Sequence, residues 1–201
     1  MVYGTMGRVL WVDLSTRTMT EETISDRVYR NYLSGTGLAA YLLYRRSPAG
    51  ADPLGPDNVL GFVSGILTGT GSLFTGRWMV VGKSPLTGTW GDANCGGNLA
   101  PAIKQCGYDG IFFTGVSPSP VYFFSDGNRC EIREAGDLWG RDAVETEEIL
   151  MRNANGRRKA RVACIGPAGE RLSLISGVVN DGGRLAARSG LGAVMGAKRL
   201  K

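Results

Sequence analysis

Short runs of β-branched and aromatic residues, bounded by turn-forming residues, recur along most of the chain. Such runs are typical of β-strands. They predict strands at 8–14, 58–65, 77–83, 108–115, 121–132, 160–166 and 172–179. The sequence Ser-Asp-Gly-Asn at 125–128 divides the fifth of these runs. It predicts a hairpin, because Asp-Gly accepts the positive φ angles of a tight turn.

Apolar residues at helical spacing predict helices at about 25–33, 36–46, 98–106 and 141–154. In the last of these the acidic residues come early, as the helix dipole prefers. Strands outnumber helices, and adjacent strands are often joined by short turns. The pattern therefore favours an α+β fold over a regular doubly wound sheet.

The order of these elements contains a weak internal repetition. A strand, a glycine-rich turn and a second strand at 59–83 are echoed at 162–179, and each set precedes a glycine-rich loop and a small-residue helix. The two loops lie at 91–107 and 180–196. Related loops would place two similar anion-binding segments in one domain. The alternative, that both loops merely begin helices, stays equally open.

The loop at 180–196, with the sequence NDGGRLAARSGLGAVMG, carries Arg184 and Arg188 among its glycines. Arginine beside such a loop suggests a phosphate, because the guanidinium fork fits one and free backbone N–H groups add further donors. The sequence GTGLAA at 35–40 fits the dinucleotide fingerprint G-x-G-x-x-A. That fingerprint needs a preceding strand, and the preceding residues have a helical pattern. We therefore interpret these glycines as a break between two helices.

The composition is that of a globular domain. The chain has 201 residues, of which 43% are hydrophobic and 20% charged, with a net charge of +5. Basic residues gather only at 152–161 and in the C-terminal KRLK, which we interpret as a solvated face and a tail. No nucleic-acid-binding motif accompanies them, so we expect no nucleic-acid partner. The sequence has neither a membrane-spanning apolar run nor a signal peptide, so we expect no membrane association and a cytoplasmic location.

Histidine is absent. Its absence excludes the Ser-His-Asp triad, the Cys-His pair and the usual zinc ligand sets. The cysteines at 95, 106, 130 and 164 form no C-x-x-C pair, which argues against a self-contained zinc or iron–sulfur site and fits free thiols in a reducing compartment. Catalysis by this chain alone would have to use carboxylates, lysine or a cofactor.

Many blocks of the sequence match one known family in consistent order. They include YGTMGRVLWVDLST, GRWMVVGKSPLTG, GDANCGG, CGYDGIFFTG, RVACIGPAGE and VVNDGGRLAARSGLGAVMGAKRLK. Over essentially the whole chain, 1–201, the sequence resembles the N-terminal domain of the tungsten-containing aldehyde ferredoxin oxidoreductases. The resemblance implies an α+β domain of two related halves, roughly 1–118 and 119–201. It also implies a cofactor in which two pyranopterins chelate tungsten (or molybdenum), with magnesium bridging their phosphates.

The resemblance also implies a set of cofactor-binding residues. Arg77 matches an arginine that bonds a pterin and leans toward an iron–sulfur cluster. The backbone carbonyls of Asn94 and Leu185 match the magnesium ligands. The remaining matches are neighbouring cofactor contacts, namely Cys95, Gly96, Arg184, Ala187 and Arg188.

Three of these matches carry alternatives. Ala187 stands where the family often has glycine, which leaves the closest backbone approach in question. For Arg77 the alternative is a surface salt bridge. For Cys95 we favour a small buried contact over a tungsten ligand, because the family holds its metal through dithiolene sulfur.

The four-iron, four-sulfur cluster and the acid/base residues of the family belong to two further helical domains that this chain lacks. The implied partners are therefore those cluster-bearing domains or a subunit carrying them, ferredoxin as electron acceptor, and in one option further copies of the chain. The implied reaction is oxidation of an aldehyde to a carboxylic acid, and we expect the chain alone to be inactive. The alternatives are a non-catalytic pterin carrier or assembly module and a basic interaction domain.

Overall fold

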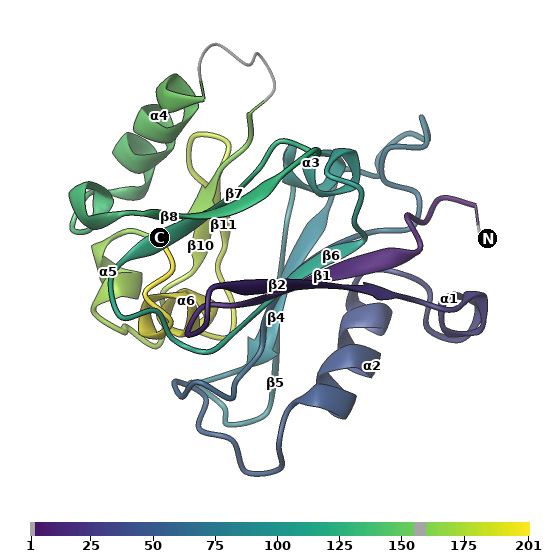
Figure 1. Cartoon of the computed structure of the whole chain (residues 1–201), viewed down its shortest axis with the longest axis horizontal. Coiled ribbons are helices and arrows are strands. Elements are labelled where there is room, and N and C mark those ends of the chain that lie inside the picture. The colour runs from purple at the N-terminus through teal and green to yellow at the C-terminus, as the bar shows by residue number, and fades with distance from the viewer. Residues whose placement is uncertain (1–2, 155–159) are drawn as a thin grey trace.

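A computed structural model describes residues 3–154 and 160–201 (Figure 1). The first half of the chain forms β1 Arg8–Asp13, β2 Thr18–Thr23, α1 Asp26–Tyr32, α2 Thr36–Arg46, β3 Leu60–Ser64, β4 Trp78–Lys83, β5 Trp90–Cys95, α3 Leu99–Gln105 and β6 Gly110–Thr114. The second half forms β7 Val121–Ser125, β8 Cys130–Glu134, the 3-10 helix η1 Gly136–Leu138, α4 Ala143–Asn153, β9 Ala163–Cys164, α5 Pro167–Glu170, β10 Val178–Asn180, β11 Arg184–Ala186 and α6 Leu191–Ala197.

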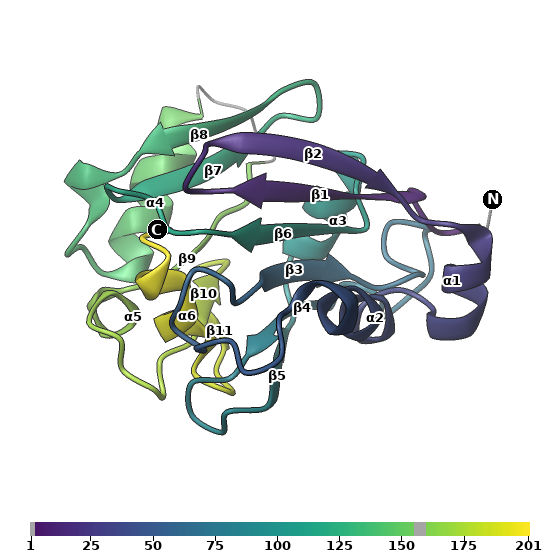
Figure 2. The ribbon, with the colours of Figure 1, turned by 60° about the horizontal axis from the view of Figure 1, so that its bottom comes forward.

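A mixed sheet of six strands, in the order β2-β1-β6-β3-β4-β5, forms the centre of the molecule. Strand β1 shows what covers each of the two faces of this sheet. Val9 packs with apolar residues of α1 and α2, whereas Leu10 and Val12 pack with apolar residues of β10, α6 and the C-terminal residues. In Figures 1 and 2, α1 and α2 lie at one end of the molecule and α4, α5, α6 and β9–β11 at the other. The expected α+β fold is confirmed.

The strands of the two halves pair in the same way. The hairpins β1–β2 and β7–β8 are both antiparallel, and so are the successive pairs in β3-β4-β5 and β9-β10-β11. Strand β1 pairs in parallel with β6, and Val121 of β7 forms a parallel bridge with Leu200. These matched pairings support the division into two related halves, which stays a proposal.

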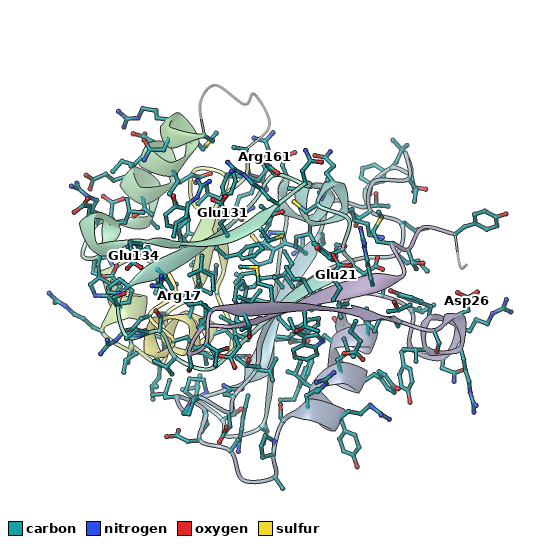
Figure 3. All side chains as sticks on the ribbon, in the orientation of Figure 1. Arg17, Glu21, Asp26, Glu131, Glu134 and Arg161 are labelled. Carbon is teal, nitrogen blue, oxygen red and sulfur yellow. The ribbon has the colours of Figure 1, made fainter. Side chains whose placement is uncertain are left out.

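An ion pair joins the two hairpins. Arg17, in the turn between β1 and β2, donates to Glu134 at the end of β8 (Figure 3). This contact holds the pKa of Glu134 below its usual value, with the hydrogen bond from Arg17 as the main cause. Both side chains are largely exposed, so the pair positions the hairpins and adds little to stability.

The glycines at 35 and 37 separate two helices, as expected. Gly35 precedes α2 with a φ of 63°, and a Cβ on Gly37 would lie 1.9 Å from the carbonyl oxygen of Tyr32 at the end of α1. The element before the GTGLAA sequence is therefore a helix. A dinucleotide fingerprint would need a strand at this place.

The strand expected at 172–179 is wrong for most of its length. Only Val178–Asn180 forms a strand, and the preceding residues form turns in which Ser173 N donates to Ala168 O and Ser176 N to Ser173 O. Leu172 has a φ of 60°, and the side chain of Ile175 is 79% exposed. Residues 172–177 therefore lie mostly at the surface and form no strand, and only Val178 and Val179 of the run are paired in a sheet. The strand expected at 160–166 is shortened to Ala163–Cys164.

The C-terminal KRLK is not a solvated tail, which corrects the expectation from charge. Lys198 and Lys201 are 0% and 2% exposed. Lys198 Nζ donates to the carbonyl oxygens of Pro56 and Gly115, and Lys201 Nζ lies 2.5 Å from a carboxylate oxygen of Glu170. The other basic run, 152–161, includes 155–159, which lie outside the described residues, so its solvated face stays a prediction.

Candidate functional site

Two glycine-rich turns from different halves of the chain meet beside β5. The first follows β5 at 96–98, and the second joins β10 to β11 at 181–183. The Asn180 side chain donates to Gly96 O at 3.3 Å, and the Asp181 carboxylate accepts from the backbone N of Asn98 at 2.5 Å. The segments that the sequence singled out as possible anion cradles are therefore in direct contact.

Arginine side chains converge on the first turn. A Cβ placed on Gly96 would lie 3.5 Å from Nη1 of Arg184 and 3.9 Å from Nη1 of Arg77. Arg77 also donates to the side-chain oxygen of Asn94, which lies in β5. A side chain at position 96 would occupy the space beside both guanidinium groups, so glycine leaves this approach open.

The cationic groups at this site are exposed. Arg77, Arg184 and Arg188 all lie at the surface. Within the described residues, no acidic side chain forms a salt bridge with any of the three. The surface salt bridge considered as the alternative role of Arg77 is thus absent there. Guanidinium groups that lack an acidic partner and lie beside glycine-rich backbone fit phosphate oxygens.

Cys95 lies beneath this surface. It is the last residue of β5, opposite Trp78 of β4, and is only 5% exposed. Its Sγ donates to Asn180 Oδ1 at 3.2 Å. Burial raises the pKa of the Cys95 thiol, and the charges of Arg77 and Arg184 oppose that rise. A protonated, buried thiol fits the expected small contact and not a metal ligand.

The two residues expected to offer carbonyls lie on neighbouring edge strands. Asn94 is in β5, at the edge of the six-stranded sheet, and Leu185 is the central residue of β11, at the edge of the three-stranded sheet. Strands β5 and β11 contact each other. Because an edge strand leaves one row of backbone N–H and C=O groups unpaired, both strands can present carbonyls at this face.

The segment 184–188 is also fixed at its far end. Ser189 Oγ donates to Asp92 O at 3.1 Å, and Ser84 Oγ donates to Ser189 O at 2.9 Å. Ala187, within this segment, is exposed and does not have a positive φ. Its backbone conformation therefore does not require the glycine that the family often has at this position.

Three residues that hold the site together were not among the expected site residues. They are Asn180, Asp181 and Ser189, and each bonds to a segment more than eighty residues away in the chain. The sequence Asn-Asp-Gly-Gly at 180–183 was a signal of a turn. It could not show that the turn binds β5, because that contact exists only in the folded chain.

The described residues contain neither a metal-binding cluster nor a membrane-spanning helix. Among residues 3–154 and 160–201, no three His, Cys, Asp or Glu side chains are grouped so that they could hold a metal ion. The four cysteines are free. No helix in the described part of the chain is long and apolar enough to cross a membrane.

Known proteins resemble this chain over its whole length. Residues 9–201 match the family described as aldehyde ferredoxin oxidoreductase, N-terminal domain. The chain is 44% identical over 200 residues to the tungsten-containing aldehyde ferredoxin oxidoreductase of Thermococcus kodakarensis, covering 100% of this chain and 33% of that protein. It is 31% identical over 215 residues to the WOR-like subunit of an aliphatic sulfonate oxidoreductase of Pyrococcus furiosus, covering 100% of this chain and 34% of that protein.

A solved structure is similar as well. The chain superposes with a TM-score of 0.96 and 39% identity on a chain of the active site complex BamBC of benzoyl-coenzyme A reductase, solved with 1,5-dienoyl-CoA. The match covers 100% of this chain and 30% of that one. The chain thus spans about a third of the length of its relatives. The resemblance found in the sequence is confirmed, and the chain belongs to the aldehyde ferredoxin oxidoreductase N-terminal domain family.

Proposed function

We propose that this chain seats the cofactor of an aldehyde:ferredoxin oxidoreductase-like enzyme, which oxidises aldehydes to carboxylic acids. The cofactor would be a tungsten or molybdenum bis-pyranopterin, with magnesium at its phosphates. The observation that carries the proposal is the convergence of Arg77 and Arg184 on Gly96, in a family whose relatives are named as tungsten-containing enzymes. These guanidinium groups are exposed and have no acidic partner among residues 3–154 and 160–201, so they match the charge of pterin phosphates.

Each site residue has a defined part in this proposal. Arg77, Arg184 and Arg188 bind the anionic groups, and Gly96 lets them approach the backbone. The backbone carbonyls of Asn94 and Leu185 would hold magnesium, which prefers oxygen ligands. Cys95 and Ala187 contribute contact surface. When bound, the metal and its pterins supply the two-electron chemistry, while the protein supplies orientation and electrostatics.

We further propose that the rest of the enzyme covers this face. The segment before Arg77 lies beside the site, since a Cβ on Gly76 would lie 3.3 Å from Gly97 O. Within that segment Leu73 is 81% and Phe74 100% exposed. Because the relatives are about three times as long, helical domains that carry a four-iron, four-sulfur cluster are the partners that fit, with ferredoxin accepting the electrons.

In our proposal, parts of the enzyme other than this chain determine which substrate is bound. Similar chains occur in proteins named for aldehydes, for aliphatic sulfonates and for benzoyl-coenzyme A. These proteins share a similar domain although their named substrates differ. This domain therefore fits a role in holding the cofactor and not in selecting the substrate. The free cysteines add support for a cytoplasmic enzyme.

The test is metal and pterin analysis of the protein isolated from its native cells. We expect tungsten or molybdenum by inductively coupled plasma mass spectrometry, with pterin in twofold molar excess over the metal. An Arg184→Ala, Arg188→Ala double variant produced in the same cells should lose most of both. Wild-type protein free of both metal and pterin would contradict the proposal.

A further inference from the structure

Two consecutive side chains, Asn180 and Asp181, join the halves of the chain at the arginine site. Asn180 is 1% exposed and uses both ends of its amide, since Oδ1 accepts from Cys95 Sγ and Nδ2 donates to Gly96 O. Asp181 uses one carboxylate oxygen for the backbone N of Asn98, at 2.5 Å, and for its side-chain Nδ2, at 3.2 Å. The buried amide of Asn180 is paired at both ends, which favours one arrangement of its surroundings, and the half-buried Asp181 adds two bonds to the same turn.

The two turns fit together closely around Gly97. A Cβ on this residue would lie 2.2 Å from Asp181 Oδ2 and 2.7 Å from Asn180 Nδ2. Glu147 of α4 also accepts from the backbone N of Gly182 at 2.8 Å. The turn at 181–183 is therefore bonded both to α4 and to the turn after β5.

These contacts determine where Arg184 and Gly96 lie relative to each other. Asn180 is the ladder partner of Arg184 in the β10–β11 pair, and its amide bonds Gly96 O. One side chain thus connects the backbone that carries the guanidinium group to the glycine that the group approaches. A shift of this turn would separate Arg184 from Gly96 and Arg77.

We infer that Asn180 and Asp181 are positioning residues of the anion site, which set the spacing between Arg184 and the Arg77–Gly96 side without touching the anion themselves. This inference rests on the proposed function, because it needs an anion at the arginines. It assigns to the Asn-Asp pair a role separate from that of the arginines, which supply the charge.

The positioning role of Asp181 can be distinguished from its electrostatic effect, because the two have opposite effects on anion binding. Asp181 is an anion near a cationic site, so removing its charge alone would strengthen anion binding. Loss of the turn contact would weaken anion binding. Asp181→Asn removes the charge but keeps an oxygen acceptor for Asn98, and asparagine tolerates the φ of 44° at this position. Asp181→Ala and Asp181→Gly remove the charge and the acceptor, and glycine does so without backbone strain.

The experiment measures pyrophosphate binding to the full chain by titration calorimetry in the presence of magnesium. We expect Asp181→Ala and Asp181→Gly to bind about tenfold more weakly than wild type, the size typical of residues that orient a binding group. Asp181→Asn should bind as tightly as wild type or more tightly. Asp137→Ala, which removes an exposed carboxylate of η1, serves as the control for net charge and should not weaken binding.

Hydrogen exchange at the Asn98 amide gives a second readout that does not depend on the anion. Its protection should fall in Asp181→Ala and Asp181→Gly and stay in Asp181→Asn, because only the first two lose the acceptor. The inference is overturned if wild type binds pyrophosphate and all three Asp181 variants bind it equally well or better. If wild type itself does not bind, the proposed function fails and the inference falls with it, so the two failures are distinguishable.

Discussion

At the scale of single residues, we expect Arg77 to contribute to anion binding and not to the stability of the fold. Its side chain is exposed and donates to Asn94, so we expect Arg77→Ala to leave the melting temperature unchanged. A hydrogen bond to a charged partner contributes about 1.5–3 kcal/mol, so pyrophosphate binding should weaken by roughly 10- to 100-fold. Calorimetry and thermal unfolding on the same samples test both points. The control is Arg30→Ala, which removes an exposed arginine of α1, and equal effects of the two variants would contradict the role of Arg77.

Lys198 makes the stability of the fold depend on pH. Burial lowers its pKa from 10.5 to about 8, against the opposing charges of Asp13 and Asp57. Between these pKa values the unfolded chain binds more protons at this lysine, so Lys198 alone should make stability rise with pH, by at most about 1.4 kcal/mol per unit. Burial raises the pKa of the Cys95, Cys106 and Cys164 thiols, so these groups make stability fall with pH in the same window. Urea unfolding of wild type and Lys198→Met at several pH values between about 8 and 9.5 isolates the lysine as the difference between the two slopes. The slope should be lower in Lys198→Met than in wild type, and equal slopes would refute the assignment.

Individual site residues differed in how far the sequence could predict them. Arg184 and Arg188 were recognisable because arginines in a glycine-rich loop already suggest an anion. Asn180, Asp181 and Ser189 were not, because their roles depend on hydrogen bonds to residues distant in sequence. The reverse error occurred at the C-terminus, where charge suggested solvent exposure. There, carbonyl and carboxylate partners bury Lys198 and Lys201.

At the scale of elements, the edge strands were the hardest to predict. The segments that form β5 and β11 were expected to be glycine-rich loops, and β2, with the sequence TMTEET, lacks an apolar run. All three are edge strands, whose pairing comes from neighbours and not from their own propensity. The apolar run at 172–179 shows the converse, because it has strand propensity and no strand partner over most of its length. Long elements such as α2 and α4 were predicted to within two residues at each end.

The contact between the two turns predicts the effect of Gly97→Ala. The new Cβ would overlap the Asp181 carboxylate, and the φ of 114° adds backbone strain. We expect a loss of about 2–4 kcal/mol in the free energy of unfolding, since strain alone costs about 1–3 kcal/mol. Gly183→Ala is a matched control, because Gly183 has a φ of 118° and nothing within 4 Å of its Cβ position. If Gly97→Ala and Gly183→Ala lower the free energy of unfolding in urea equally, the two turns are not in close contact at Gly97.

At the scale of the whole molecule, the two halves share one apolar core. Leu10, Val12 and Trp78 of the first half belong to the same buried cluster as Val178 and Leu191 of the second. A shared core couples the halves, so the chain should unfold in a single cooperative step. The sequence suggested the repetition but not this packing, because hydrophobic pattern shows which faces are buried and not what buries them.

A destabilising substitution in one half should therefore lower the free energy of unfolding measured in the other half. Leu191 of α6 is 0% exposed, so Leu191→Ala should cost about 2–5 kcal/mol, as expected for truncation of a buried leucine. The same loss should appear when unfolding is followed at Trp78, which lies in the first half and is also 0% exposed. Tryptophan fluorescence, with the other tryptophans replaced by phenylalanine, and far-ultraviolet circular dichroism give the two curves. Coincident, equally shifted transitions are expected because the core formed by both halves is lost as a unit. A shift in circular dichroism alone, with the Trp78 transition unmoved, would mean that the halves unfold separately and that the arginine site is joined only by its turns.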